Sequence, residues 1–400
     1  MGPHIRVGVD VGCKTHQVAI AGPEGRILEN FVIPHSQAGF ARFFSRVEKH
    51  SSKLGVPVVV AMEGLNGWSR PLDQMILERG YRLYNVNNLK LARFREIFPG
   101  GAKTDALDVR KILELWHLQD HLPVAKDVLQ EVPEVPPENQ KLKRLTRRRR
   151  QLVNEKVRVV NRMQADLLAV CPELLAITGD ATNLWFLRFL SSRDDLRELR
   201  SMAREEVLAI RGIGKKYAGV IAQWQKKARF SAEAEYVGPM IVADARRLLE
   251  VLREIATLAE AIEGLVASSP LAQRIDSIPG FGAISSGELA GEIGTMERFH
   301  SERSLALYLG MCPLDHQSGE YKGSKRPRQV NRRAKATLMT AVARHMERVP
   351  QSRAYYEKKK AEGKKHNQAV RALGRHLVRV MWAMLAQDRD YELREVSCPS

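Results

Sequence analysis

Two aspartates three residues apart, Asp105 and Asp108, form the pattern in this chain that is best suited to chemistry. On a helix, residues at this spacing lie on one face about a turn apart, so the two carboxylates point the same way. Carboxylate oxygens are hard ligands that suit a divalent metal. Asp-x-x-Asp pairs are also common on solvated helix surfaces, so a metal site requires further acids from elsewhere in the chain.

Two such acids stand at the ends of expected strands. Ile5–Asp10 alternates like a half-buried strand and ends on Asp10, and the apolar run Val56–Met62 is followed by Glu63. Ligands bind at the carboxyl ends of strands in open sheets, and carboxylates gathered there repel one another unless a cation neutralises them. The sequence therefore predicts a metal site of four acids, with Mg²⁺ expected and Mn²⁺ as an alternative. These acids are Asp10, Glu63, Asp105 and Asp108.

The elements around these acids alternate between strands and helices over residues 1–130. Three strands, a helix, a strand, a helix, a strand and further helices follow in that order, which is the order of the α/β RNase H-like (RuvC-like) fold. The expected strands are Ile5–Asp10, Gln17–Ala21, Arg26–Ile33, Val56–Met62 and Arg82–Val86, and the main helices are Gln37–His50, a helix from Pro71 to a stop at Gly80, Leu89–Phe98 and Asp105–Leu118.

The composition points to a polyanionic partner. The 400 residues include 64 Lys or Arg against 46 Asp or Glu, a formal charge of +18. No apolar run approaches the length of a membrane-spanning helix and the N-terminus lacks a signal-peptide pattern, so we expect a cytoplasmic, nucleoid-associated protein without a membrane partner. The cysteines are scattered, which argues against a zinc site or a disulfide framework. They are Cys13, Cys171, Cys312 and Cys398.

A proline-rich linker over 131–138 separates this region from two long helices, Asn139–Val170 and Met240–Ala267. Both carry apolar residues near heptad spacing, which predicts a coiled coil over 139–270 with a helical block, 171–238, inserted between its two helices. The two helices could pair antiparallel within one chain or between chains. Either arrangement would be structural and would carry no chemistry of its own.

Seven cations crowd the start of the first long helix. Along a helix they repel one another unless phosphates lie nearby, which favours a nucleic-acid surface over a solvated coiled-coil face. They are Lys141, Lys143, Arg144, Arg147, Arg148, Arg149 and Arg150.

Two glycine-containing turns precede helices and resemble the hairpins of helix-hairpin-helix modules. They are Ile210–Gly214 and Ile278–Gly282. Glycine lets backbone N–H groups approach a phosphate at a helix N-terminus, so two copies in a basic protein predict contact with a nucleic-acid backbone. The residues assigned to this contact are Gly212, Gly214, Gly280 and Gly282.

A serine lies in a glycine-containing loop within the last expected domain, a mainly α region over 271–386 that is followed by a tail, 387–400, without a clear signal. Ser318 precedes Gly319, and such a serine is ordinarily a turn residue that becomes a nucleophile only when assisted. A cationic run without acids follows it and suits a phosphate. Its members are Lys322, Lys325, Arg326, Arg328, Arg332, Arg333 and Lys335.

Together these motifs resemble the DEDD transposases of bacterial insertion sequences, the bridge-RNA-guided serine recombinases. The resemblance lies in Asp10, Glu63 and the Lys103–Asp108 segment, and then in Ile278–Gly282, Leu307–Pro313 and Gln317–Gly319 in the same order. It covers roughly Ile5–Leu118 and Ser277–Leu385. Two features depart from the family pattern: Glu63 is followed by Gly-Leu-Asn-Gly, and the block 171–238 is an addition for which we expect nucleic-acid contact or RNA specificity.

The resemblance implies a RuvC-like domain, a coiled coil and a C-terminal serine-bearing domain. It implies that the four acids hold Mg²⁺ and that Ser318 forms a covalent phosphoserine with the cleaved strand. Its partners would be double-stranded donor and target DNA and a structured non-coding guide RNA. It further implies a homodimer or homotetramer in which acids and serine meet from different protomers. His316 is the only obvious base near Ser318 in the sequence.

Three other functions fit part of the sequence. A metal-dependent RuvC-like junction nuclease would use water in place of Ser318. A sugar kinase or ATPase of the actin-like fold would use Asp10–Gly12 and the following strand as a phosphate loop, although the basic surface and the paired glycine hairpins oppose this. A non-catalytic nucleic-acid-binding protein would not need the acids.

Overall fold

The computed structural model describes residues 3–64, 69–96, 105–121, 128–325, 327 and 330–393. The chain forms two compact units, Met1–Glu134 and Val135–Ser400. Their boundary falls within 131–138, the segment predicted as a linker. The finer division of the second unit into domains stays a prediction.

The first unit is built on a mixed six-stranded sheet with the order β3-β2-β1-β4-β5-β6. Strand β1 pairs antiparallel with β2 and parallel with β4, and β4 pairs parallel with β5. The predicted order of strands and helices is confirmed; the short edge strand β6 was not predicted. The strands are β1 (Ile5–Val11), β2 (Thr15–Ala21), β3 (Ile27–Pro34), β4 (Val58–Glu63), β5 (Arg82–Val86) and β6 (Leu129–Glu131).

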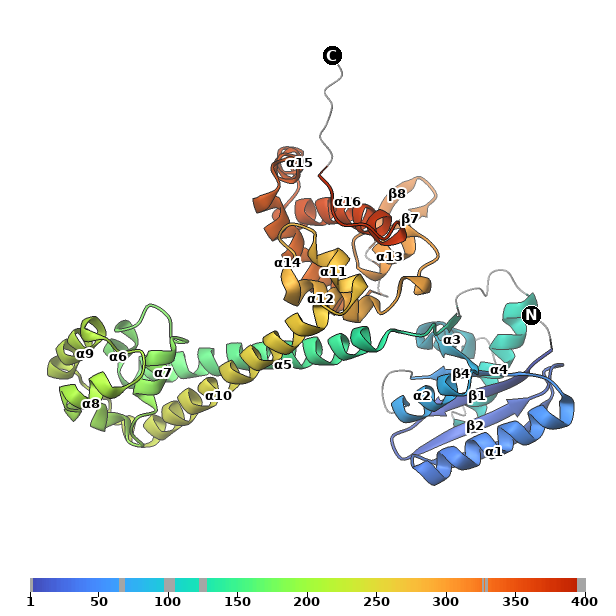
Figure 1. Ribbon diagram of the computed structural model, residues 1–400, viewed down its shortest axis with the longest axis horizontal. Helices are drawn as coiled ribbons and strands as arrows, with labels where there is room; N and C mark the ends of the chain where they lie inside the picture. The colour runs from blue at the N-terminus through green and yellow to red at the C-terminus, as the bar shows by residue number, and fades with distance from the viewer. Residues whose placement is uncertain are drawn as a thin grey trace, which may run out of the picture. The chain divides into compact units, whose positions relative to one another are not determined.

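Helices cover both faces of this sheet (Figure 1). Helix α1 (Gln37–Leu54) buries Phe40, Phe43 and Phe44 against one face, together with α2 (Arg70–Glu78). Helix α4 (Asp105–His121) buries Ile112 and Trp116 against the other face, next to α3 (Asn88–Arg95). Because side chains alternate along a strand, β4 supplies Val58, Val60 and Met62 to the core on the first face and Val59 and Ala61 to the core on the second.

The second unit is organised around two long helices, α5 (Pro137–Val170) and α10 (Ala234–Val266), which pack side by side within one chain. Three ion pairs show that they run antiparallel, because the residue number falls on α5 as it rises on α10. The pairs are Arg162–Asp244, Glu155–Arg247 and Arg148–Glu254.

Helix α10 begins six residues before the predicted start at Met240 and includes Pro239. Pro239 is the sixth residue of the helix and lies in its second turn, so it removes one intrahelical hydrogen bond there.

Separate hydrophobic cores lie at the two ends of this helix pair (Figure 1). One core joins the C-terminal half of α5 and the N-terminal half of α10 to the predicted inserted block. That block contains α6 (Pro172–Ala176), α7 (Leu184–Leu190), the 3₁₀ helix η2 (Leu196–Ser201), α8 (Arg204–Ala209) and α9 (Lys215–Lys227).

The other core, which we call the C-terminal core, includes Leu142 of α5 and Ile262 of α10. Its helices are α11 (Pro270–Asp276), α12 (Gly282–Ile293), η3 (Met296–Arg298), α13 (Glu302–Tyr308), α14 (Arg332–Arg348), α15 (Pro350–Ala361) and α16 (His366–Ala386), and its hairpin is formed by β7 (Leu314–Ser318) and β8 (Tyr321–Lys325).

In the described part of the chain no single helix is long and apolar enough to cross a membrane, although α10 and α11 meet that test as a pair bent by 104°.

Candidate functional site

Two of the predicted acids lie next to each other on the sheet of the first unit. Asp10 and Glu63 are direct partners in the parallel register of β1 and β4. Residues paired in this way point to the same face. Their face is the one that α4 covers, because Val59 and Ala61, which precede Glu63 at every second position, pack with Ile112 and Trp116 of that helix.

Helix α4 brings a third acid toward the same end of the sheet. A Cβ added at Gly8 would lie 3.2 Å from the Val109 Cγ1, and one added at Gly25 would lie 3.4 Å from the His117 Nδ1. Gly8 is near the middle of β1, and Gly25 follows β2, whose end pairs with the start of β1. The helix therefore runs against β1, and its N-terminal end, with the buried Asp108, lies toward Asp10.

The donor chemistry of these residues suits a hard cation, since each offers carboxylate oxygens. Among the described side chains, however, no three His, Cys, Asp or Glu groups come close enough to hold a metal ion. The backbone of Asp105 begins α4, but its side chain is outside the described residues. The structure thus places three predicted ligands on one face of the unit without bringing them into a coordination shell.

Ser318 lies in the second unit at the end of a strand, whereas the sequence predicted a loop. It is the last residue of β7 and pairs with Tyr321 across a turn at Gly319, whose φ of +56° favours glycine. His316 stands two positions earlier, on the same face of the hairpin, and its ring packs edge-on against Tyr321 with centroids 6.0 Å apart. All five residues of β7 are exposed, so Ser318 lies at the surface of this unit.

The cations predicted around Ser318 are only partly described. Lys325 ends β8, and Arg332 and Arg333 form the exposed first turn of α14. Arg326, Arg328 and the side chain of Lys322 lie outside the described residues.

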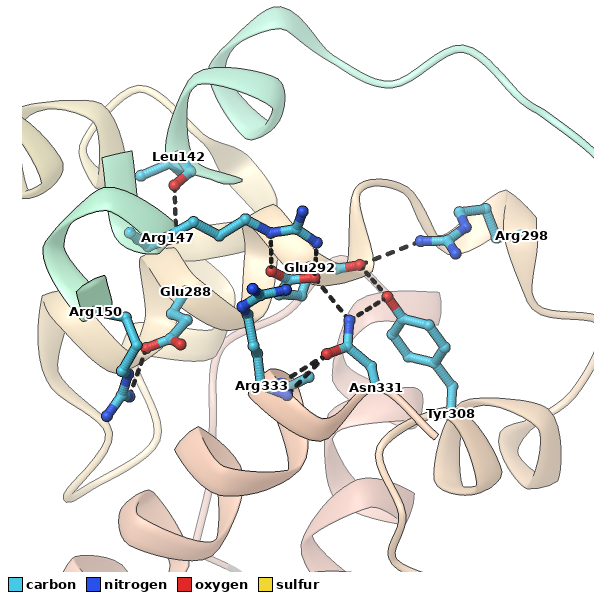
Figure 2. A network of polar contacts seen from close by, with 11 residues as sticks. Leu142, Arg147, Arg150, Glu288, Glu292, Arg298, Tyr308, Asn331 and Arg333 are labelled. Atoms are coloured by element: carbon cyan, nitrogen blue, oxygen red, sulfur yellow. Dashed lines mark hydrogen bonds and ion pairs between the residues drawn. The ribbon is translucent and has the colours of Figure 1, made fainter. Parts of the chain in front are cut away.

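The basic start of α5 has acidic partners that the sequence analysis did not find. The Nε and Nη2 of Arg147 donate to the two carboxylate oxygens of Glu292 on α12, at 2.6 and 2.9 Å (Figure 2). Glu292 is fully buried, and it also accepts from the Asn331 Nδ2 at 2.7 Å, which in turn contacts the Tyr308 hydroxyl. We call these four side chains the Glu292 network.

Hydrogen bonding keeps Glu292 ionised in spite of its burial. Burial alone would raise its pKa, but the hydrogen bonds from Arg147 and Asn331, with the charges of Arg147 and Lys143, leave the pKa below its usual value. Because a buried charge without a partner is strongly destabilising, the network has a structural role and ties α5 to α12 and α14.

Two more arginines of this cluster are also paired. The Arg150 Nη2 donates to the nearly buried Glu288 at 2.9 Å, and Arg148 pairs with the half-exposed Glu254 of α10. The premise that phosphates must neutralise the whole cluster is therefore wrong for Arg147, Arg148 and Arg150. Lys141 and Arg144 remain exposed, and Lys143 and Arg149 are half-buried.

The signal that could have revealed these partners is a pair of acids four residues apart in an otherwise apolar helix. Glu288 and Glu292 lie on α12, where every residue from 285 to 293 is buried. Acids in such a helix require partners from another element.

The two glycine turns differ in their surroundings. Gly280 has a φ of +92° and is buried, and a Cβ there would lie 2.6 Å from the His345 backbone nitrogen of α14. A glycine is therefore required here because α14 packs closely against it, and not because a phosphate approaches it, as was predicted. Gly282, Gly212 and Gly214 are exposed, and a Cβ at Gly282 or Gly214 would meet no atom within 4 Å.

Two family profiles match the chain. A transposase domain profile of the DEDD type from the IS110 group matches residues 7–172, and the profile of the IS116/IS110/IS902 transposase family matches residues 272–357. The first match includes all four predicted acids, and the second includes Ser318 and the Glu292 network apart from Arg147.

Insertion-element proteins are similar over nearly the full length. The insertion element IS110 protein of Streptomyces coelicolor is 26% identical over 402 residues, which cover 97% of this chain and 95% of the relative. The insertion element IS900 protein of Mycobacterium paratuberculosis is 27% identical and covers 98% of each chain. The transposase for insertion sequence IS1111A of Coxiella burnetii is 26% identical over 222 residues, which cover 50% of this chain and 58% of the relative.

Proposed function

We propose that this chain, which belongs to the IS110/IS116/IS902 family of insertion-sequence transposases, cleaves and rejoins DNA strands through Ser318 with the help of its acidic residues. The observation that carries the proposal is the placement of Asp10 and Glu63 as direct register partners on the face toward which α4 presents Asp108. The element order of the first unit and the strand order of its sheet support an RNase H-like fold for this domain.

The acids would hold Mg²⁺, or Mn²⁺ in its place. Asp10, Glu63, Asp105 and Asp108 supply the oxygen ligands that such an ion requires, and a bound ion would stabilise the charge that develops on a scissile phosphate. Without an ion these carboxylates would repel DNA. Metal binding and DNA cleavage should therefore depend on the same residues.

Ser318 would supply the nucleophile. Its Oγ would form a bond to phosphorus as the bond to one strand end breaks, which leaves a phosphoserine on the protein and a free hydroxyl on the displaced strand. The serine proton would go to solvent or to His316, which shares a face of the hairpin with it. Rejoining reverses these steps with the hydroxyl of another strand.

The choice of DNA is proposed to rest on a structured guide RNA that pairs with donor and target duplexes. The net charge of +18 supports binding to nucleic acids of either kind. We further propose a homodimer or homotetramer in which the acids of one subunit act with the serine of another. Co-purification of a short RNA transcribed from the same element would test the guide, and the mass of the assembled complex would test the subunit number.

The central test is to trap the covalent protein–DNA adduct. We expect the unmodified chain to form an adduct with labelled element-end DNA that survives denaturing electrophoresis and that disappears with a chelator. Ser318→Ala should abolish both adduct and cleavage, and Asp10→Asn should abolish cleavage while DNA binding remains.

A metal-dependent junction nuclease is the second candidate, because the acids do not by themselves identify the nucleophile. In that case Ser318→Ala would still cleave DNA at the normal rate and no adduct would form. Loss of cleavage in Asp10→Asn together with normal cleavage in Ser318→Ala would therefore replace the serine mechanism with attack by water.

A further inference from the structure

The stretch from Val207 to Ala232 contains no acid and six cations. It forms the second half of α8, the turn at Gly212, helix α9 and the start of the following segment. All six cations are exposed. We call them the α9 cations; they are Arg211, Lys215, Lys216, Lys226, Lys227 and Arg229.

The four lysines lie in two rows along the solvent side of α9. Lys226 follows Lys215 by eleven residues, and Lys227 follows Lys216 by the same number, which is close to three full turns and about 16 Å along the axis. Ala218, Ile221 and Trp224 are buried on the opposite side. The helix thus presents an elongated positive surface.

No acid offsets this charge. Among the described residues none of the α9 cations forms an ion pair, although acids are present in the same block. Four of those acids pair with other arginines: Asp194 with Arg246, Asp195 with Arg197, and both Glu198 and Glu206 with Arg193. The charge of these four acids is therefore neutralised by arginines that do not belong to the α9 cations.

The helix dipole explains only half of the lysines. Lys226 and Lys227 lie in the last turn, where cations are favourable, but Lys215 and Lys216 lie in the first turn, where the exposed N–H groups already carry positive charge. The first turn contains no acid. A structural role therefore does not account for this pair of lysines.

The surface is held in place by its contacts with α7. The Trp185 and Tyr217 rings are stacked with centroids 4.4 Å apart, and the Arg188 Nη1 donates to the Arg211 carbonyl oxygen at 2.8 Å. Gly212 has a φ of +98°, and a Cβ there would lie 3.2 Å from the Trp185 Cβ. The turn that begins the surface is thus packed closely on a buried aromatic residue.

We propose that the α9 cations bind the phosphodiester backbone of a nucleic acid, at the end of the α5–α10 pair opposite the C-terminal core. The inference rests on the proposed function for the kind of partner and adds a binding surface to it. Between the lysine rows lie Gly219, Ala222 and Gln223, which offer no large apolar anchor of the kind that protein interfaces use. Repeated point charges without such an anchor suit regularly spaced phosphates.

The test compares two triple variants of the full chain. Lys215→Gln, Lys216→Gln and Lys226→Gln are combined in one, and Arg42→Gln, Lys49→Gln and Lys53→Gln of α1 are combined in the other. The second set is also exposed and forms no ion pair in the described part of the molecule. Binding of a labelled DNA duplex of arbitrary sequence and of an RNA hairpin of similar length is measured across a range of salt concentrations.

We expect the α9 variant to bind at least one of these probes roughly tenfold more weakly, and the slope of log affinity against log salt to fall by about 0.9 for each duplex phosphate that the variant no longer neutralises. Weaker binding of DNA alone, of RNA alone or of both supports the proposal and identifies the source of the phosphates. A variant with arginine at the same three positions should bind normally, and thermal unfolding of each variant checks the fold.

Unchanged affinity and slope in the α9 variant would overturn the proposal, and so would equally weakened binding in the α1 control, because the effect would then follow net charge. Either result would leave the transposase mechanism standing if Asp10→Asn still abolished cleavage. Conversely, normal cleavage by Asp10→Asn would refute that mechanism without affecting the binding of a phosphate backbone by α9.

Discussion

Two cationic helices of the second unit have different relations to the acids around them. The start of α5 holds seven cations, and Arg147, Arg148 and Arg150 form ion pairs with acids of α10 and α12. Helix α9 and its flanks hold six cations, and in the described residues none of them is paired. The helix with the denser charge in the sequence is therefore the one that has three of its seven cations paired with acids of the protein.

This difference shows that charge density along a sequence does not identify a nucleic-acid surface. The partner of Arg147 lies 145 residues away in the chain and is fully buried. An arginine so engaged stabilises the fold, and its charge and two of its five N–H donors are already taken by the carboxylate. An exposed lysine without an acid has all its donors available, and releases counterions when it meets a phosphate.

The largest expected effect comes from removing the buried acid of the Glu292 network. We expect Glu292→Gln to lower the free energy of unfolding by about 3 kcal/mol, because it leaves the Arg147 charge without its partner. The value lies at the low end for buried pairs because the Arg147 side chain is 30% exposed. Urea unfolding followed by circular dichroism measures the change.

The matched control is Glu254→Gln, which removes the partner that Arg148 and Arg247 share. All three side chains are at least 37% exposed, so solvent and salt weaken their attraction and the expected decrease is below about 1 kcal/mol. Equal decreases for the two variants would show that the buried Glu292 network does not hold α5 to α12 more strongly than an exposed ion pair does. The contrast between the cations of α5 and those of α9 would then be lost.

A second effect follows from the lowered pKa of Glu292. A carboxyl group whose pKa is lower in the folded protein stabilises it above the unfolded pKa, about 4.5, and this contribution is lost as the pH falls through the folded pKa. We expect the difference in unfolding free energy between the unmodified chain and Glu292→Gln to be constant from neutral pH to about pH 4.5, and to shrink below it.

The difference between the two proteins is the correct quantity to measure. Burial lowers the pKa of His345, so this histidine destabilises the fold as the pH falls below its ordinary pKa, but it does so in both proteins and cancels. A difference that grew in acid would contradict the assignment of an ionised Glu292.

Local patterns in the sequence predicted most of the fold of the first unit. Alternation placed Asp10 at the end of β1, and a continuous apolar run placed Glu63 at the end of β4, so their adjacency followed from the parallel pairing of the two strands. The long helices were predicted in the same way from their apolar spacing. Each of these features depends on residues close together in the chain.

The features that were missed depend on distant or weak signals. The pairing of Arg147 with Glu292 joins helices far apart in sequence, and no local pattern specifies it. Strand β7 has no buried face, since all five of its residues are exposed, so it lacks the alternation by which a strand is identified. The three-residue strand β6 is too short for such a pattern.

The smallest expected effect concerns the cations of α5 that remain exposed. Lys141 and Arg144 form no ion pair in the part of the chain that the structure describes, so they resemble the α9 cations rather than their neighbour Arg147. We expect Lys141→Gln with Arg144→Gln to leave the free energy of unfolding unchanged, and to reduce the salt slope of duplex DNA binding by at most about 1.8, which corresponds to two phosphates at about 0.9 each.

Arg148→Gln, measured in parallel, should alter the slope less, because Glu254 already offsets that charge. If Arg148→Gln reduced the slope as much as one exposed cation does, an internal acid would not prevent an arginine from binding phosphate. Ion pairing would then fail as the property that separates the two helices, and exposure alone would decide which cations bind nucleic acid.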